Sequence, residues 1–162
     1  MAQLRQLIAG IVLLGVGLGG FFDGIVFHQI LQWHHMLSSK LPPTSVVNIE
    51  INTFADGVFH AVAWVVTLAG VAVTIRAVDA LRAVRDARLL GRFVVGGLLA
   101  GWGAFNTIEG LVDHEILGIH HVRAGPDEVL YDVAFLAWGA VMLVVGVWLL
   151  RRTVSGVSQP RS

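Results

Sequence analysis

The sequence predicts an all-α integral membrane protein: a four-helix bundle built from two tandem, pseudo-two-fold-related helical hairpins. Three observations predict this fold. Of the 162 residues, 56% are hydrophobic and only 14% are charged, whereas soluble domains carry about 25% charged residues. Four apolar stretches, at about 6–37, 52–75, 92–117 and 129–150, reach the roughly 20 residues that a helix needs to cross a bilayer. Finally, part of the first stretch is repeated in the third.

The first apolar stretch follows Arg5, as the apolar part of a signal peptide would follow a basic residue. Its apolar run is too long for a signal peptide, however, and no small-residue cleavage site ends it before Asp23. We therefore expect a retained span and a single transmembrane domain over 1–162. The tail 153–162 is polar and contains Pro160, so we expect it to be disordered.

Basic residues lie mostly on one side of the predicted spans. Of the 11 basic residues, only Lys40 and Arg123 lie between spans 1 and 2 or between spans 3 and 4. The others precede span 1, join spans 2 and 3, or follow span 4. The positive-inside rule therefore places both termini and a solvated helical linker over 76–92 in the cytoplasm. The loops near 38–51 and 118–128 then face outward.

Residues 10–35 are repeated without a gap, 86 residues later, as residues 96–121, with eleven of 26 paired positions identical. Each copy carries an acid, a histidine five residues later, and a pair of adjacent histidines. These are Asp23, His28, His34 and His35 in the first copy, and Glu109, His114, His120 and His121 in the second. Because spans 1 and 3 run in the same direction, the hairpins should be related by an axis along the membrane normal.

Spans 2 and 4 add further ionisable residues to the repeat. Asp56 and Asp132 look like partners, each followed three residues later by phenylalanine. His60 has no histidine partner, because Leu136 stands at that position. Asp113 adds another carboxylate to span 3.

Counting about 1.5 Å of rise per residue from the basic ends puts these ionisable residues of all four spans in one layer towards the outer face. A single charge inside a membrane costs at least about 2.5–3.5 kcal/mol, so these side chains should turn inward and bind one another, water or a cation. Mixed imidazole and carboxylate groups suit transition metals, and the chain has no cysteine. The sequence therefore predicts one or two metal ions, with copper or zinc favoured and iron also compatible.

His28, His60 and His114 are the expected imidazole ligands. The expected carboxylates are Asp23, Asp56, Glu109, Asp113 and Asp132. On an ideal α-helix, His28 and His114 lie about 140° around from Asp23 and Glu109, so one helix is not expected to aim both at one ion. The pairs His34-His35 and His120-His121 should lie about 9 Å further out. They are candidates for a funnel, a second site or an interfacial belt.

Several uses of this layer stay open. The sequence favours metal handling, with a metal-dependent membrane oxidoreductase as the alternative. A polar network without metal, a proton path or a b-type haem with His28 and His114 as axial ligands is a further alternative. The partners expected are the lipid bilayer and the metal ion, and a homo-oligomer or a metal-delivery partner is compatible with the sequence. Zero net charge gives no reason to expect nucleic-acid binding.

Three strings carry a resemblance to a known family: FFDGIVFHQILQWHHM, NTFADGVFHAVAW and FNTIEGLVDHEILGIHHVR. They resemble an uncharacterised family of predicted bacterial four-span membrane proteins, classed as a domain of unknown function. The resemblance covers roughly 8–150. It implies the four-span fold and a bacterial inner-membrane location, and it implies no activity.

Overall fold

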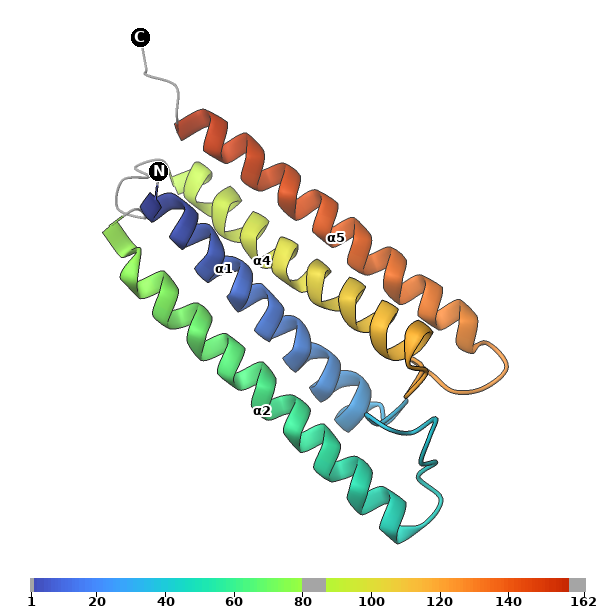
Figure 1. Cartoon of the computed structure of the whole chain (residues 1–162). Helices are drawn as coiled ribbons and strands as arrows, with labels where there is room; N and C mark the ends of the chain where they lie inside the picture. The colour runs from blue at the N-terminus through green and yellow to red at the C-terminus, as the bar shows by residue number, and fades with distance from the viewer. Residues whose placement is uncertain (1, 80–86, 158–162) are drawn as a thin grey trace.

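The computed structural model describes residues 2–79 and 87–157, which contain four long helices and no strand. The helices are α1 (Ala2–Phe22), α2 (Val46–Arg76), α4 (Ala87–Glu109) and α5 (Glu128–Val157) (Figure 1). α1 continues into a π-helical segment, η1 (Asp23–Ile30), and α4 continues into η2 (Gly110–Ile116). All four are long and apolar enough to cross a membrane. The predicted all-α fold with four spans is confirmed.

The first π-helical segment ends earlier than the straight helix that we expected, and the second ends within one residue of its expected end. The chain leaves the helix after Ile30 and Ile116, and residues two positions later, Gln32 and Gly118, have φ values of 50° and 52°. This left-handed region suits glycine and costs another residue about 1–2 kcal/mol. The span predicted to reach residue 37 therefore stops at residue 30, and the histidine pairs follow a turn.

α1 and α4 form the centre of the bundle. α1 packs against both α2 and α4, and α4 also packs against α5, so the helices lie in the order α2, α1, α4, α5 (Figure 1). The flanking helices leave wide apolar surfaces exposed, including Phe54 and Trp64 on α2 and Val144 on α5. In a membrane protein these surfaces face lipid.

Glycines let the two central helices approach at backbone distance. A Cβ atom at Gly15 would meet the Leu98 carbonyl oxygen, and one at Gly101 would meet the Val12 carbonyl oxygen. Small residues at such crossings permit close packing where no hydrophobic effect drives helices together. The α1–α4 contact therefore fixes the relative position of the two copies of the repeat.

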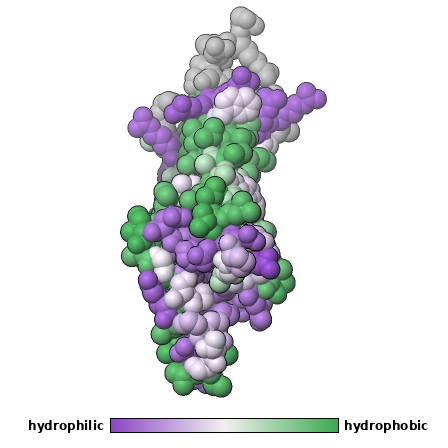
Figure 2. All heavy atoms as spheres, turned by 90° about the vertical axis from the view of Figure 1, so that its right-hand side faces the viewer, coloured by the Kyte–Doolittle hydropathy of each residue, from purple (hydrophilic) through white to green (hydrophobic). Residues whose placement is uncertain are grey.

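The two ends of the bundle differ in their content of basic residues. α1 and α4 begin, and α2 and α5 end, at one end of the bundle (Figure 1), and Arg5, Arg76, Arg92, Arg151 and Arg152 belong to this end. The loops over 31–45 and 117–127 lie at the other end. Hydrophilic residues gather over that loop end, with hydrophobic residues on either side (Figure 2).

Two expectations concern segments that are only partly described. The helical linker expected over 76–92 includes 80–86, which lie outside the described residues. The tail expected to be disordered from residue 153 instead continues α5 as far as Val157, and 158–162 lie outside the described residues.

Candidate metal centre

Four histidine rings meet at the loop end of the bundle. His28 belongs to η1 and His114 to η2, and His34 and His120 follow the turns after these segments. All four side chains are buried, with no more than 3% of any residue exposed. Ring centroids are 4.3 Å apart for His28 and His34, 4.6 Å for His34 and His120, and 4.8 Å for His114 and His120. We call these four residues the histidine cluster.

The expectation that His34 and His120 lie well outside the carboxylate layer is wrong. The turns at Gln32 and Gly118 end the helices, so counting helical rise past Ile30 and Ile116 does not apply. Backbone bonds close each turn: Trp33 donates to the Phe27 carbonyl at 3.0 Å, and Ile119 donates to the Asp113 carbonyl at 2.9 Å. As a result, the first histidine of each pair is buried beside His28 and His114.

The π-helical geometry also brings together an acid and the histidine that follows it five residues later. His28 Nε2 lies 3.1 Å from Asp23 Oδ2, and His114 Nε2 lies 3.0 Å from Glu109 Oε1. Residues five apart diverge on an α-helix, but a π-helix pairs i with i+5 and places them on one face. The expectation that one helix cannot aim both groups at one ion is therefore wrong for Glu109 and His114, which belong to one group of possible metal ligands.

Each ring of the histidine cluster has its Nδ1 atom next to an oxygen on its outer side. The contacts are His28 with Asp56 Oδ1 at 2.8 Å, His34 with the Val122 carbonyl at 2.8 Å, His114 with Asp132 Oδ1 at 3.3 Å, and His120 with the Met36 carbonyl at 3.1 Å. An outer carboxylate or carbonyl that receives Nδ1–H fixes the tautomer of a metal-binding histidine and leaves Nε2 free for the ion.

Asp56 and Asp132 also fasten the loops to the helices. Asp56 accepts from His35 Nδ1 at 2.7 Å and from the Met36 backbone N–H at 2.8 Å. Asp132 accepts from His121 Nδ1 at 2.6 Å and from the next backbone N–H, that of Val122, at 2.9 Å. The second histidine of each pair therefore holds a loop, while the first enters the histidine cluster.

The cluster has more acceptors than neutral histidines can satisfy. In His28, His114 and His120, each ring nitrogen lies within 3.3 Å of an oxygen. A neutral imidazole carries only one N–H. Glu109 Oε2 is also buried without a hydrogen-bond partner. Neutral rings cannot donate to all of these oxygens, so part of the buried carboxylate charge is left unpaired, which is costly.

His34 supplies a neutral ring to this group. Burial, together with the neighbouring His28 and His120, lowers the pKa of His34 from its usual 6.5 to about 2. Its Nδ1 faces the Val122 carbonyl, and its Nε2 is buried without a partner. The Nε2 lone pair is therefore available to a cation.

Two overlapping groups in the described part of the chain could hold a metal ion. One is His28, His34 and His120, and the other is Glu109, His114 and His120. Within each group the ligand atoms lie within 4.8 Å of one another, and all the residues are buried. His120 belongs to both groups.

The remaining predicted site residues lie around the histidine cluster. His60 is outside both groups: its Nδ1 bonds to the Asp56 carbonyl of its own helix at 2.7 Å, and its ring lies near Phe21. Asp113 is half-buried and lines a cavity next to Glu109. Asp56 and Asp132 contact the histidines from outside, as described above.

Sequence reasoning missed three residues that shape the site. Met36 and Val122 act through backbone groups, which leave no side-chain signal, although both directly follow a histidine pair. Asn52 is fully buried, accepts from the Leu37 backbone N–H at 3.0 Å and donates to the Leu41 carbonyl at 2.8 Å. Its position four residues before Asp56, on the same helix face, was the available signal.

Among curated proteins and solved structures, none matches this chain. A family model described as "Predicted membrane protein (DUF2243)" matches residues 9–153, which include both copies of the repeat and most of each of the four spans. The chain therefore belongs to this family of membrane proteins of unknown function.

Proposed function

We propose that this membrane protein binds one transition-metal ion in the histidine cluster. The observation that carries the proposal is the arrangement of the four buried rings, each with Nδ1 next to an outer oxygen. Their Nε2 atoms are then left for the interior, beside the Asp23 and Glu109 carboxylates. Imidazole nitrogen with carboxylate oxygen suits copper(II), zinc and iron. Of these we favour copper or zinc, with iron as the next candidate.

The shared ligand supports one ion per chain. His120 has its Nδ1 next to the Met36 carbonyl, so only its Nε2 lone pair can bind a metal. An ion with His28 and His34 and an ion with Glu109 and His114 would both need that lone pair. The two groups are therefore alternative or merged sites, and we do not expect two complete sites.

We propose that the ion reaches the histidine cluster from the loop end. A cavity of about 830 Å³ lies there, lined by His34, His35 and His121 among other polar residues. The arginine-rich opposite end supports a cytoplasmic location for both termini in a bacterial inner membrane, so this cavity would open to the outer side. Such a site suits handling of a water-soluble ion.

We further propose that a pseudo-two-fold axis relates the two hairpins, because His34 and His120 each contact the loop of the other copy.

A metal-dependent oxidoreductase is the second candidate. A cavity of about 270 Å³ beside Glu109 favours it, because a second molecule could approach the histidine cluster there. Haem fits less well: His28 and His114 have both ring nitrogens next to oxygen, and the cluster rings contact one another, which leaves no room for a porphyrin between them.

Elemental analysis of the protein purified in detergent tests the proposal. After loading with copper(II) or zinc and removal of excess metal, we expect about one equivalent per chain. Less than about a tenth of an equivalent of every transition metal would overturn the proposal. The histidine cluster would then be a polar network held by extra protons. Two tightly bound equivalents would contradict the shared role of His120.

A further inference from the structure

A mainly apolar cavity of about 270 Å³ ends at the edge of the histidine cluster. Its apolar walls include Val16, Phe105, Ile108 and Val112, and Glu109 lines it as well. Ile108 is 63% exposed on the outside of the bundle, where lipid would lie. Glu109 itself is buried, and its Oε2 atom has no hydrogen-bond partner. The cavity thus combines an apolar wall with two carboxylates, the half-buried Asp113 and the buried Glu109, whose Oε2 atom has no hydrogen-bond partner.

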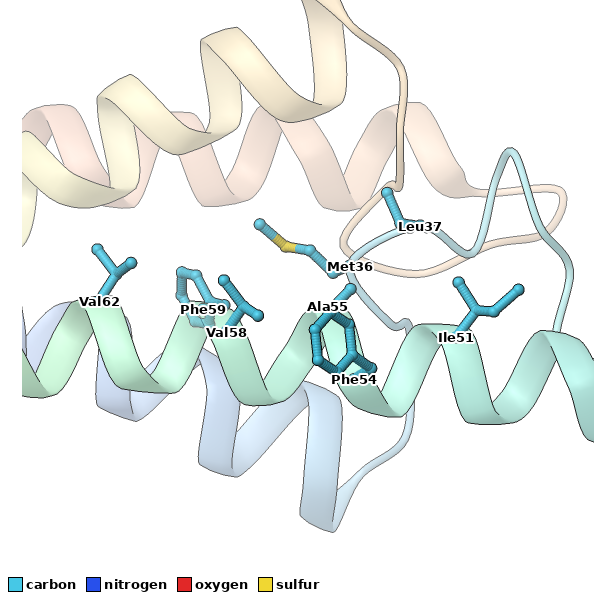
Figure 3. Close-up of a pocket in the computed structure, with 8 residues that line it drawn as sticks. All are labelled: Met36, Leu37, Ile51, Phe54, Ala55, Val58, Phe59 and Val62. Carbon is cyan, nitrogen blue, oxygen red and sulfur yellow. The ribbon is translucent and has the colours of Figure 1, made fainter.

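A second apolar cavity, of about 520 Å³, adjoins the first one. Met36 and Phe59 line both. Met36 lies over the face of α2 that carries Phe59 and Val58, and the lining continues along this helix from Ile51 to Val62 (Figure 3). Together the two cavities form a space that is polar at its short end, near Glu109, and apolar over its longer part, along α2.

The residues around this space differ from those at the paired positions on the other side of the bundle, although the polar contacts of the two copies match. At the positions paired with Val16, Ile108, Asp113 and Val62, the other side carries Trp102, Phe22, Phe27 and Trp138. These aromatic rings fill the equivalent region: Phe22 lies 5.0 Å from Trp102, 5.9 Å from Phe27 and 5.9 Å from Trp138, measured between centroids. The open cavity therefore results from specific smaller or polar residues and not from the fold itself.

We propose that the two cavities bind a lipophilic molecule that has a hydroxyl head and a hydrocarbon tail. The hydroxyl would donate to Glu109 Oε2, because a buried acceptor without a hydrogen-bond partner destabilises the protein. The tail would lie against Phe59 and Val58 along α2, and a bilayer supplies molecules of this kind. Glu109 also contacts His114 and His120, so the head reaches the edge of the histidine cluster. Binding needs no metal, and only a reaction of the head at an ion would rest on the proposed function.

Photo-crosslinking of the metal-free full chain in detergent tests this proposal. The probe is a long-chain primary alcohol with a diazirine next to its hydroxyl, and a probe of equal length without the hydroxyl is the comparison. We expect the alcohol to label residues 105–113 and an excess of unlabelled long-chain alcohol to prevent this labelling. We expect the hydroxyl-free probe to label them at least about ten-fold less.

The aromatic side supplies the blocking substitutions. Val16→Trp with Ile108→Phe copies Trp102 and Phe22 into the cavity, and should reduce labelling at least about ten-fold. Val141→Trp with Val144→Phe, at exposed positions of α5, should leave labelling unchanged. If the first variant fails to fold, Val112→Trp at the cavity rim tests the same point. Equal labelling by both probes, or labelling that persists in the blocked variant, would overturn the proposal.

Discussion

Replacing His120 with alanine is expected to abolish tight metal binding, whereas His60→Ala should leave it nearly unchanged. His120 belongs to both groups that could hold an ion, but His60 bonds to its own helix and contributes to neither. The loss should exceed the about 10–100-fold effect of removing a group that only orients a ligand. Competition titration of the purified variants with copper(II) and zinc measures it.

His60→Ala is the matched control, because it also removes an imidazole from the same end of the bundle. The sequence alone predicted His60 as a ligand together with His28 and His114, whereas the structure places His120 in both possible ligand groups and His60 in neither. Comparing the two substitutions therefore shows which of the two histidines binds the ion. Normal binding by His120→Ala together with loss of binding by His60→Ala would place the ion on α2 and contradict the proposed site.

Asp56→Asn and Asp132→Asn should each weaken metal affinity by about 10–100-fold. They should also lower the free energy of unfolding by about 1–3 kcal/mol. Asp56 accepts from His28, His35 and the Met36 backbone. Asparagine has a single acceptor oxygen, so it cannot satisfy these donors. Metal titration gives the affinity, and chemical denaturation in detergent gives the stability.

Asp127→Asn removes an exposed carboxylate from the loop over 117–127. It should change neither the metal affinity nor the free energy of unfolding. An unchanged metal affinity in both Asp56→Asn and Asp132→Asn would mean that the contacts of these carboxylates with Nδ1 of His28 and His114 do not influence metal binding. The ion would then be held elsewhere.

The fold was predictable from the sequence because the bilayer demands long apolar helices, and the four runs meet that demand without ambiguity. The order of the four helices in space was harder to predict from the sequence. The glycines that bring α1 and α4 together repeat in the sequence, but the same glycines could have packed on any neighbour. Only the structure shows Gly15 and Gly101 at the crossing of the two central helices.

The candidate site was predictable in its residue types and only partly in its geometry. The repeat singled out six of the seven histidines. Their roles depended on a change from α-helical to π-helical hydrogen bonding and on a turn at Gln32, and neither has a reliable sequence signal. For that reason His34 and His120 were expected too far out, and His28 was expected to diverge from Asp23.

X-ray absorption spectroscopy of the copper- or zinc-loaded protein tests the central claim most directly, since it reports the atoms bound to the ion. We predict two to four imidazole nitrogens at about 2.0–2.1 Å, with room for one carboxylate oxygen. This imidazole signal should be lost in His120→Ala. A shell of oxygen atoms without imidazole scattering, unchanged by His120→Ala, would contradict a metal ion in the histidine cluster.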